Sequence, residues 1–284
     1  MGRFTRVIEA ARNLSTLGAT RPAAMKIYLF VLADPIKSRI PFTRDKWLSV
    51  RLSYNHVPFS CVVRERGDLQ VAMEVFREDA YVLPDSIDPE MILDLGAHIG
   101  LATIYFRLRY PGARIHAFEP SAGRFNMLAR NVEAFDGIEI HHFGLSSRTG
   151  HASLYNKPRA AGYRATIVQR EGSEETEVIE LQTLDEVLEN LDIDWVDVVK
   201  VDIEGAEFDL FRSCRSLPKF GYIVGELHEH LIPGTCEDFA SFFTGFELSL
   251  KYQPDSAAYN SSLYYFSASN EWDRAAAHPP ATQR

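Results

Sequence analysis

The feature that most constrains this chain is an alternation of apolar, strand-like runs with amphipathic, helix-like segments between residues 91 and 227. The runs around Ile92, Val198 and Ile223 are almost entirely apolar, as strands buried on both faces of a sheet are. Strands that alternate with helices form βαβ units, which require a parallel sheet covered on both faces. We therefore expect a doubly wound α/β fold, in which the final runs FELSLKY and SLYYFSA form an antiparallel hairpin at one edge.

The chain divides into three expected regions. Residues 1–84 form an N-terminal extension, with helices up to about residue 40 and then three short strand-like runs, WLSVRL, FSCVV and LQVAMEVF, which suit a small antiparallel sheet. Residues 85–270 hold the alternating segments, and residues 271–284 lack an apolar period and are expected to be a loose tail. The extension suits a lid, a substrate wall or a contact between two subunits, and the sequence leaves these roles open.

Composition and charge exclude several classes of protein. The formal net charge of −9 argues against a nucleic-acid partner, because binding phosphates requires clustered Lys and Arg. The three cysteines are widely spaced and no CxxC occurs, so neither a disulfide framework nor a zinc site is expected. Charges interrupt the N-terminus and no apolar run is long enough to span a bilayer, so we expect a cytoplasmic protein without a transmembrane segment.

The first residues predict an amphipathic helix. Phe4, Val7, Ile8 and Ala11 recur at helical spacing, with arginines between them. Such a face packs on the domain itself, on the second subunit of a homodimer, or on a membrane surface, and the sequence does not decide among these.

The segment DLGAHIG places an acid and two glycines at the end of the first central strand. Ligands of open α/β sheets bind at such strand ends, where Gly96 allows a sharp turn and Gly100 a close approach. The spacing fits neither the dinucleotide motif nor a phosphate-binding loop, and Asp94 would repel a phosphate but accept a hydrogen bond from an ammonium. Glu119 follows 25 residues after Asp94, where an acid can accept both hydroxyls of a ribose. An amine, a ribose and no phosphate describe S-adenosylmethionine (SAM).

Four stretches, ILDLGAHIG, IHAFEPSAGRFNMLARNV, TLDEVL and VVKVDIEGAE, together resemble the FkbM-type family of SAM-dependent methyltransferases, over roughly residues 91–227. The resemblance implies a class I methyltransferase fold, Rossmann-like, with a seven-stranded sheet whose last strand is antiparallel. It also implies O-methylation of a hydroxyl on a sugar, a polyketide or a similar natural product. Family members often carry Asn where His98 stands. The cofactor-binding residues that the resemblance implies are Asp94, Gly96, Ala97, His98, Gly100, Glu119, Pro120, Gly144, Leu145 and Asp202.

A second group of polar residues follows the later strands. Strand alternation puts Asp202 and Glu204 on one side, and Glu226 and His228 on one side of the next strand. Carboxylates that converge repel each other unless a cation relieves them. The sulfonium of SAM gives some relief, and Mg²⁺ held by Asp202 and Glu226 would give more. We expect His228 or Glu204 to act as the general base, with Asp202 as a third catalytic residue.

Other polar residues are expected to have structural roles. Glu207 suits the first turn of a helix, where it complements the helix dipole. His116, His141, His142 and His230 are expected to have surface or packing roles.

The polar stretch from residue 156 to residue 177 is long for a connection and is either a substrate-binding loop or merely flexible. Its candidate substrate contacts are Arg159, Tyr163, Arg164 and Arg170. The function expected is SAM-dependent O-methylation of a small hydroxylated acceptor. The alternatives are a methyltransferase that acts on protein or nucleic acid, and a non-catalytic binding protein that keeps the fold.

Overall fold

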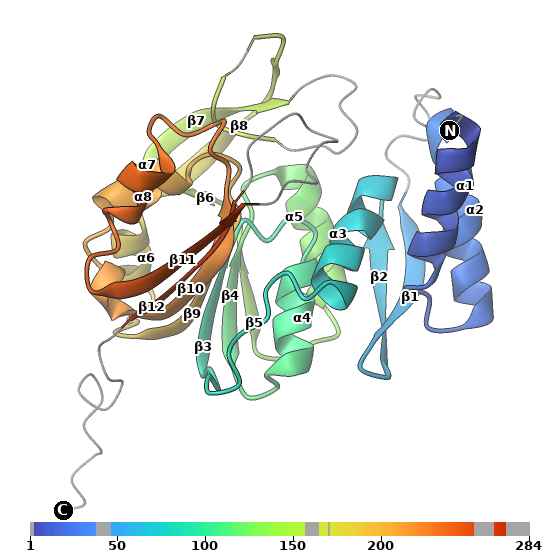
Figure 1. Cartoon of the computed structure of the whole chain (residues 1–284), viewed down its shortest axis with the longest axis horizontal. Coiled ribbons are helices and arrows are strands. Elements are labelled where there is room, and N and C mark those ends of the chain that lie inside the picture. Colours follow the sequence, from blue (N-terminus) through green and yellow to red (C-terminus); the bar gives the residue numbers. More distant parts are fainter. Residues whose placement is uncertain (1–2, 38–46, 157–164, 170, 253–263, 271–284) are drawn as a thin grey trace, which may run out of the picture.

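The computed structural model describes residues 3–37, 47–156, 165–169, 171–252 and 264–270. Within these residues, seven strands form one central sheet in the order β11-β12-β10-β9-β3-β4-β5 (Figure 1). Every neighbouring pair between β10 and β5 is parallel, and β12 is antiparallel to both β10 and β11. The strands are β3 (Met91–Leu95), β4 (Arg114–Phe118), β5 (Ile138–His141), β9 (Val196–Val201), β10 (Phe220–Leu227), β11 (Phe246–Tyr252) and β12 (Tyr264–Asn270).

This topology confirms the predicted fold class. The sheet is parallel except for its last strand, and β11 and β12 form the expected antiparallel pair at one edge. The strand order reverses between β3 and β9, which makes the carboxyl ends of these two strands the place where such sheets bind ligands.

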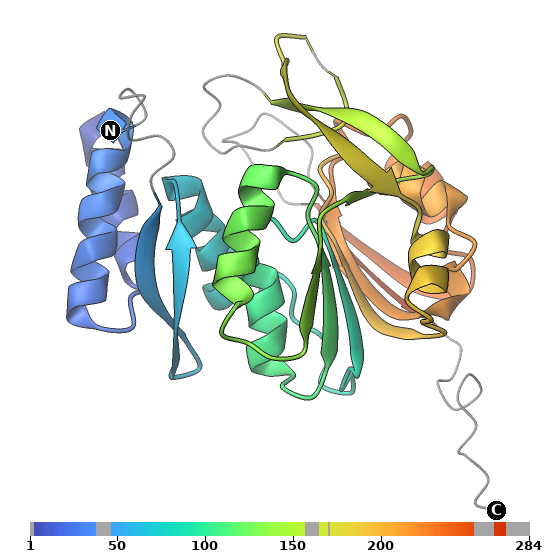
Figure 2. The same cartoon turned by 180° about the vertical axis from the view of Figure 1, so that it is seen from behind.

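Helices cover both faces of the central sheet, as Figures 1 and 2 show. One face packs on α4 (Leu101–Arg109) and α5 (Ala122–Val132), and the other on α6 (Leu184–Asn190), α7 (Glu207–Ser213) and α8 (Cys236–Ala240). A short 3₁₀ turn, η2 (Leu217–Lys219), precedes β10. Helix α6 begins with the predicted capping box, in which the Thr183 hydroxyl accepts a hydrogen bond from the backbone N–H of Glu186 at 3.2 Å. None of the described helices is long and apolar enough to cross a membrane.

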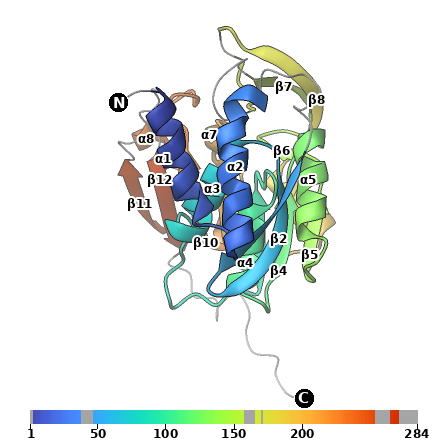
Figure 3. The same ribbon diagram turned by 90° about the vertical axis from the view of Figure 1, so that its right-hand side faces the viewer.

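The N-terminal extension packs on the α4–α5 side, and Figure 3 shows α1 and α2 as its outermost elements. It comprises α1 (Arg3–Ser15), α2 (Arg21–Lys37), the hairpin β1 (Leu48–Tyr54) and β2 (Val57–Val63), and α3 (Arg66–Arg77). The prediction of a third strand at LQVAMEVF was wrong, because these residues lie in α3. Leu69, Ala72, Met73 and Phe76 are buried at helical spacing.

A second, small sheet stands beyond the carboxyl ends of the central strands (Figure 2). It contains β6 (Gly144–Leu145), β8 (Glu174–Gln182) and β7 (Gly150–Asn156) in that order. The polar stretch that we read as one long loop therefore includes the first residues of β8. Its candidate contacts Arg159, Tyr163, Arg164 and Arg170 lie outside the described residues, as does the expected C-terminal tail.

Candidate active site

Two glycines shape the loop between β3 and α4. Gly96 has φ +77°, and a Cβ added there would lie 1.9 Å from the carbonyl oxygen of Asp202. Gly100 has φ +88°, and a Cβ there would lie 2.7 Å from the side chain of Leu128. Both positions therefore require glycine. His98 has φ +54°, in the left-handed region where Asn is also favoured, so one backbone conformation accounts for either residue.

Asp94 lies beneath this loop. Its fully buried carboxylate accepts a hydrogen bond from the Thr103 hydroxyl at 2.6 Å and pairs with Lys200 Nζ at 3.0 Å. Lys200 also donates to the carbonyl oxygen of Gly96 at 2.8 Å. Burial opposes the charge of Lys200, but Asp94 and further carboxylates outweigh it and raise its pKa. A buried carboxylate whose charge Lys200 already balances supports the loop from beneath. The expected contact of Asp94 with the ammonium of SAM stays a prediction.

Glu119 is positioned at the end of β4 by two backbone donors. It is 3% exposed, and its two carboxylate oxygens accept hydrogen bonds from the N–H groups of His98 and Ser121, each at 2.9 Å. Burial raises the pKa of Glu119 to about 7, although Arg124 and the two backbone donors act in the opposite direction. The charge of this carboxylate therefore changes within the physiological range of pH.

One cavity brings most of the predicted residues together at the carboxyl ends of β3, β4 and β9. The predicted residues that line it are Gly96, Ala97, His98, Glu119, Pro120, Gly144, Leu145, Asp202, Glu204 and Glu226. Asp94, Gly100 and His228 are not part of this lining. Apolar side chains from β4 and the small sheet, Phe118, Leu154, Ile179 and Leu181, form one wall, and α3 forms another. An apolar wall beside a few convergent polar groups is typical of a site for a small molecule.

Four carboxylates surround His228. Its Nδ1 lies 2.9 Å from Glu207 Oε1, and its Nε2 lies 3.4 Å from Glu204, 3.8 Å from Glu226 and 4.0 Å from Asp202. The imidazole is 1% exposed. Burial opposes a charged ring, but the carboxylates of Glu204, Glu207 and Asp202 outweigh it and raise the pKa of His228 to about 10.

This environment changes the role expected for His228. An imidazole with a pKa of about 10 is protonated at neutral pH and has no lone pair with which to accept a proton. Its position behind the cavity wall also keeps it from an acceptor in the cavity. The raised pKa and the position of His228 favour a protonated ring that supports Asp202 and Glu204, and they favour Glu204 over His228 as the general base. The choice between the two expected bases stays a prediction.

The same geometry bears on the expected magnesium site. Asp202, Glu204 and His228 offer ligand atoms within 4.8 Å of one another, a set that includes Asp202 but replaces Glu226 by two other residues. Mg²⁺ takes oxygen ligands in near-octahedral geometry. The carboxylates of Asp202 and Glu204 are ligands of the kind Mg²⁺ takes, whereas the ring nitrogen of His228 is not. The magnesium site expected at Asp202 and Glu226 stays a prediction.

Several functional residues escaped the sequence analysis. Lys200 supports the glycine loop, and its signal in the sequence was a charged residue between two valines of the strand VDVVKV. Glu207, which we assigned to the helix dipole, is fully buried and binds His228. The hydroxyl of Tyr81 donates to Asp202 Oδ2 at 3.4 Å. Burial, and then Asp202, raise the pKa of Tyr81 well above its ordinary value, so the phenol stays protonated.

A family model and several known proteins match this chain. The model of the family described as "Methyltransferase FkbM domain" matches residues 94–249. Methyltransferase sdnD of Sordaria araneosa is 28% identical over 171 residues, which cover 49% of this chain and 66% of that protein. The hexuronic acid methyltransferase AglP of Haloferax volcanii is 29% identical over 168 residues, which cover 58% of this chain and 66% of that protein. The chain thus spans just under two thirds of these two curated relatives.

Among solved structures, the methyltransferase FkbM from Methylobacillus flagellatus aligns over 92% of this chain and 59% of its own, with a TM-score of 0.44 and 16% identity.

Proposed function

Because the chain belongs to the FkbM methyltransferase family, we propose that it uses SAM to methylate a hydroxyl of a small molecule, such as a sugar or a polyketide. The observation that carries this proposal is that the loop at residues 96–98, Glu119 and the acids Asp202 and Glu204 all line one cavity. These are the groups needed to hold an adenosine and an amino-acid tail on one side and to receive a proton on the other.

The described residues suggest how the cofactor would be held. Glu119 would accept the ribose hydroxyls, since its carboxylate is fixed by two backbone donors and lines the cavity. Phe118 and Leu145 lie in the apolar wall beside Glu119, where an adenine would be desolvated. The loop at residues 96–98 would bind the amino-acid tail through its backbone, which Lys200 and Asp94 hold from beneath.

SAM supplies an electrophilic methyl group, so the protein must align the acceptor oxygen and remove its proton. Glu204 would take the proton, because its carboxylate lines the cavity and His228 fixes it from behind at 3.4 Å. Asp202 would help to orient the reactants, since Tyr81 holds it at the cavity wall. As the O–C bond to the methyl group forms and the C–S bond breaks, the products are a methyl ether, S-adenosylhomocysteine and a protonated Glu204.

The charge of the described cavity wall bears on the acceptor. Glu65, Asp68 and Glu74 line it in addition to the acids already named, with Arg124 and Lys200 as its basic residues. Such a wall repels an anion, so we infer an uncharged acceptor. AglP is named for methylating a hexuronic acid, which supports a sugar as the class of acceptor. A hexuronic acid is itself an anion at neutral pH, so the preference for an uncharged acceptor rests on the charge of the cavity wall alone.

The experiment is incubation of the purified protein with methyl-labelled SAM and a panel of neutral and carboxylated sugars and polyketides. The proposal predicts label in the small-molecule fraction, stable to alkali as a methyl ether is, and preferred transfer to neutral acceptors. Glu204→Gln should abolish the label. Asp209→Asn is the matched control, because Asp209 pairs with Arg212 and does not line the cavity. Alkali-labile label would indicate a methyl ester and refute hydroxyl methylation, and label in the macromolecular fraction would refute a small acceptor.

A further inference from the structure

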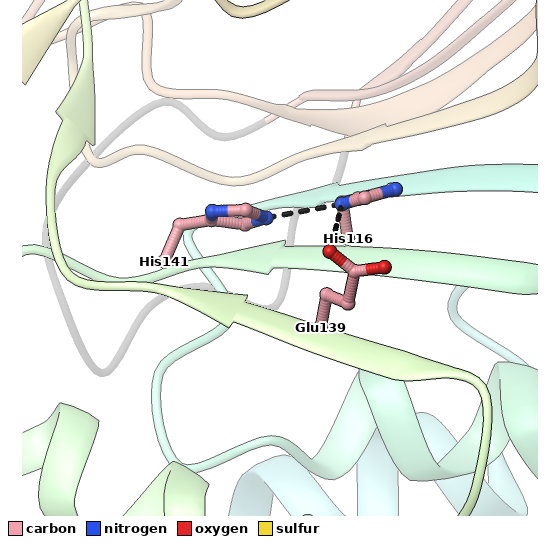
Figure 4. Close-up of side chains that lie close together, drawn as sticks. All are labelled: His116, Glu139 and His141. Atoms are coloured by element: carbon pink, nitrogen blue, oxygen red, sulfur yellow. Dashed lines mark hydrogen bonds and ion pairs between the residues drawn. The ribbon is translucent and has the colours of Figure 1, made fainter. Parts of the chain in front are cut away.

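A second cluster of ionisable side chains lies at the β4–β5 edge of the central sheet. His116 of β4 is opposite Glu139 of β5, and His141 is opposite Phe118. Because side chains alternate along a strand, His116, Glu139 and His141 share one face, the face turned away from α4 and α5. Figure 4 shows the two imidazoles and the carboxylate pointing toward one another. The methyl-transfer site described above uses none of the three.

The distances in this cluster suit a metal ion. His116 Nδ1 lies 3.0 Å from His141 Nε2 and 3.8 Å from Glu139 Oε2, and all three ligand atoms lie within 4.8 Å of one another. Zinc bonds to nitrogen and carboxylate oxygen measure about 2.0–2.2 Å, so neighbouring ligands of a tetrahedral ion lie roughly 3.3–3.6 Å apart. The separations of 3.0 and 3.8 Å fall on either side of that range. Small side-chain rotations would therefore centre an ion.

We propose that His116, Glu139 and His141 bind one Zn²⁺ ion, with water in the fourth position. Two imidazole nitrogens and one carboxylate oxygen are a donor set that zinc accepts. Glu139 is the most adaptable of the three ligands, because its side chain is 68% exposed and free to turn toward the ion. No zinc site is expected from the sequence, and that expectation was drawn from the cysteines. The site proposed here uses no thiolate.

The surroundings of the two rings prepare them as ligands. The two rings lie edge to edge, with the His116 Nδ1 and His141 Nε2 atoms turned toward one another (Figure 4). The His141 ring stacks on Phe118 with centroids 4.6 Å apart, which fixes its orientation. His116 is 5% exposed and its Nδ1 faces His141. In the metal-free protein the two nitrogens share a hydrogen bond, and the ion would take the place of the shared proton.

Zinc at this position would stiffen one wall of the cofactor cavity. Phe118, on which His141 stacks, lines that cavity, and the N–H of Glu119 donates to the carbonyl oxygen of His141 at 3.1 Å. The ion would join edge strand β5 to β4 immediately before Glu119. Its role is structural, and the methyl transfer proceeds without it.

The test is a zinc titration of the full, tag-free chain against a chromophoric chelator. We expect one equivalent of zinc. His141→Ala should weaken zinc affinity by at least about 100-fold. This exceeds the loss of about 10- to 100-fold that follows removal of a residue that only hydrogen-bonds to a metal ligand. Glu139→Gln should also weaken it, and this exposed position keeps the test independent of folding. His142→Ala is the matched control, because His142 stacks on Phe125 outside the cluster and its loss should leave zinc affinity unchanged.

Two outcomes would overturn the inference. Equal zinc affinity of the wild type, His141→Ala and Glu139→Gln would show that the ion is not held by this cluster. Loss of zinc binding in Asp202→Asn but not in His141→Ala would place the ion among the carboxylates around His228. Neither outcome depends on whether the protein methylates a hydroxyl, so the proposed function is tested separately.

Discussion

The pKa of Glu119 makes cofactor binding dependent on pH in a way that can be measured. Hydroxyl groups of a ribose donate to a carboxylate, so binding requires the ionised form of Glu119. Burial raises the pKa of this group to about 7 in the free protein. Below that pH the protein must lose a proton in order to bind, and each unit of pH therefore costs a factor of about ten in affinity.

The size of the effect follows from these values. Near pH 5 about 1% of Glu119 is ionised, so the affinity for S-adenosylhomocysteine should be about 100-fold lower than near pH 8. Glu119→Gln removes the charge but keeps one acceptor oxygen. A hydrogen bond to a charged group is worth about 1.5–3 kcal/mol, so the variant should bind roughly 10- to 150-fold more weakly at pH 8. The two proteins should converge at pH 5, where Glu119 is already neutral.

Isothermal titration calorimetry with S-adenosylhomocysteine between pH 5 and pH 8 measures both quantities. Glu65→Gln is the matched control, because Glu65 lines the same cavity and burial raises its pKa to about 7 as well. If the slope persists in Glu119→Gln and disappears in Glu65→Gln, Glu119 is not the group that binds the ribose, and the reasoning about this site is refuted.

Four further outcomes are expected. Gly96→Ala should abolish S-adenosylhomocysteine binding in titration calorimetry, because the added Cβ would lie 1.9 Å from a backbone oxygen at the end of β9. Gly112→Ala is the control and should bind normally, because a Cβ added at Gly112 meets open space. Loss of the buried cation in His228→Ala should lower the free energy of unfolding by about 3–5 kcal/mol, measured by denaturant titration; an unchanged value would contradict the charged ring. The pKa of His228 is raised on folding, so its contribution to the free energy of unfolding is complete below about pH 6.5 and is lost as pH rises through about 10. Denaturant titrations at several pH values should show this trend in the wild type but not in His228→Ala. Glu204→Gln should lower kcat by about 10²- to 10⁴-fold with little change in KM for SAM. The initial rate of the wild-type enzyme should survive dialysis against a chelator. A rate that is lost on dialysis and restored only by Mg²⁺ would refute the role given to the imidazolium of His228.

The central fold could be predicted because its signals are local. The apolar runs of β3, β9 and β10 and the capping box at Thr183 are each complete within a few consecutive residues of the sequence. Helix α3 was mistaken for a strand because its apolar residues fit both periods. Leu69, Val71, Met73 and Val75 alternate as in a strand, and contacts of α3 with α4 and with the N-terminal hairpin, which no local pattern reveals, select the helix.

The site was predicted in its members better than in their roles. The glycine loop, Glu119 and the acids after β9 meet at one cavity, as strand ends in a parallel sheet must. The roles of Asp94 and His228 depend on charges far away in the sequence. Asp94 is balanced by Lys200 on a neighbouring strand. Three of the four carboxylates around His228, those of Asp202, Glu204 and Glu207, come from the segment between β9 and α7 and the first residue of α7. Such balances appear only when the chain is folded.

The central claim is that SAM occupies the cavity with its ribose at Glu119 and its reactive end toward Asp202 and Glu204. A crystal structure of the protein with S-adenosylhomocysteine tests this most directly. In that structure we expect the ribose hydroxyls within hydrogen-bonding distance of the Glu119 carboxylate and the sulfur on the side of Asp202. A ligand bound elsewhere, or bound here with its ribose away from Glu119, would contradict it.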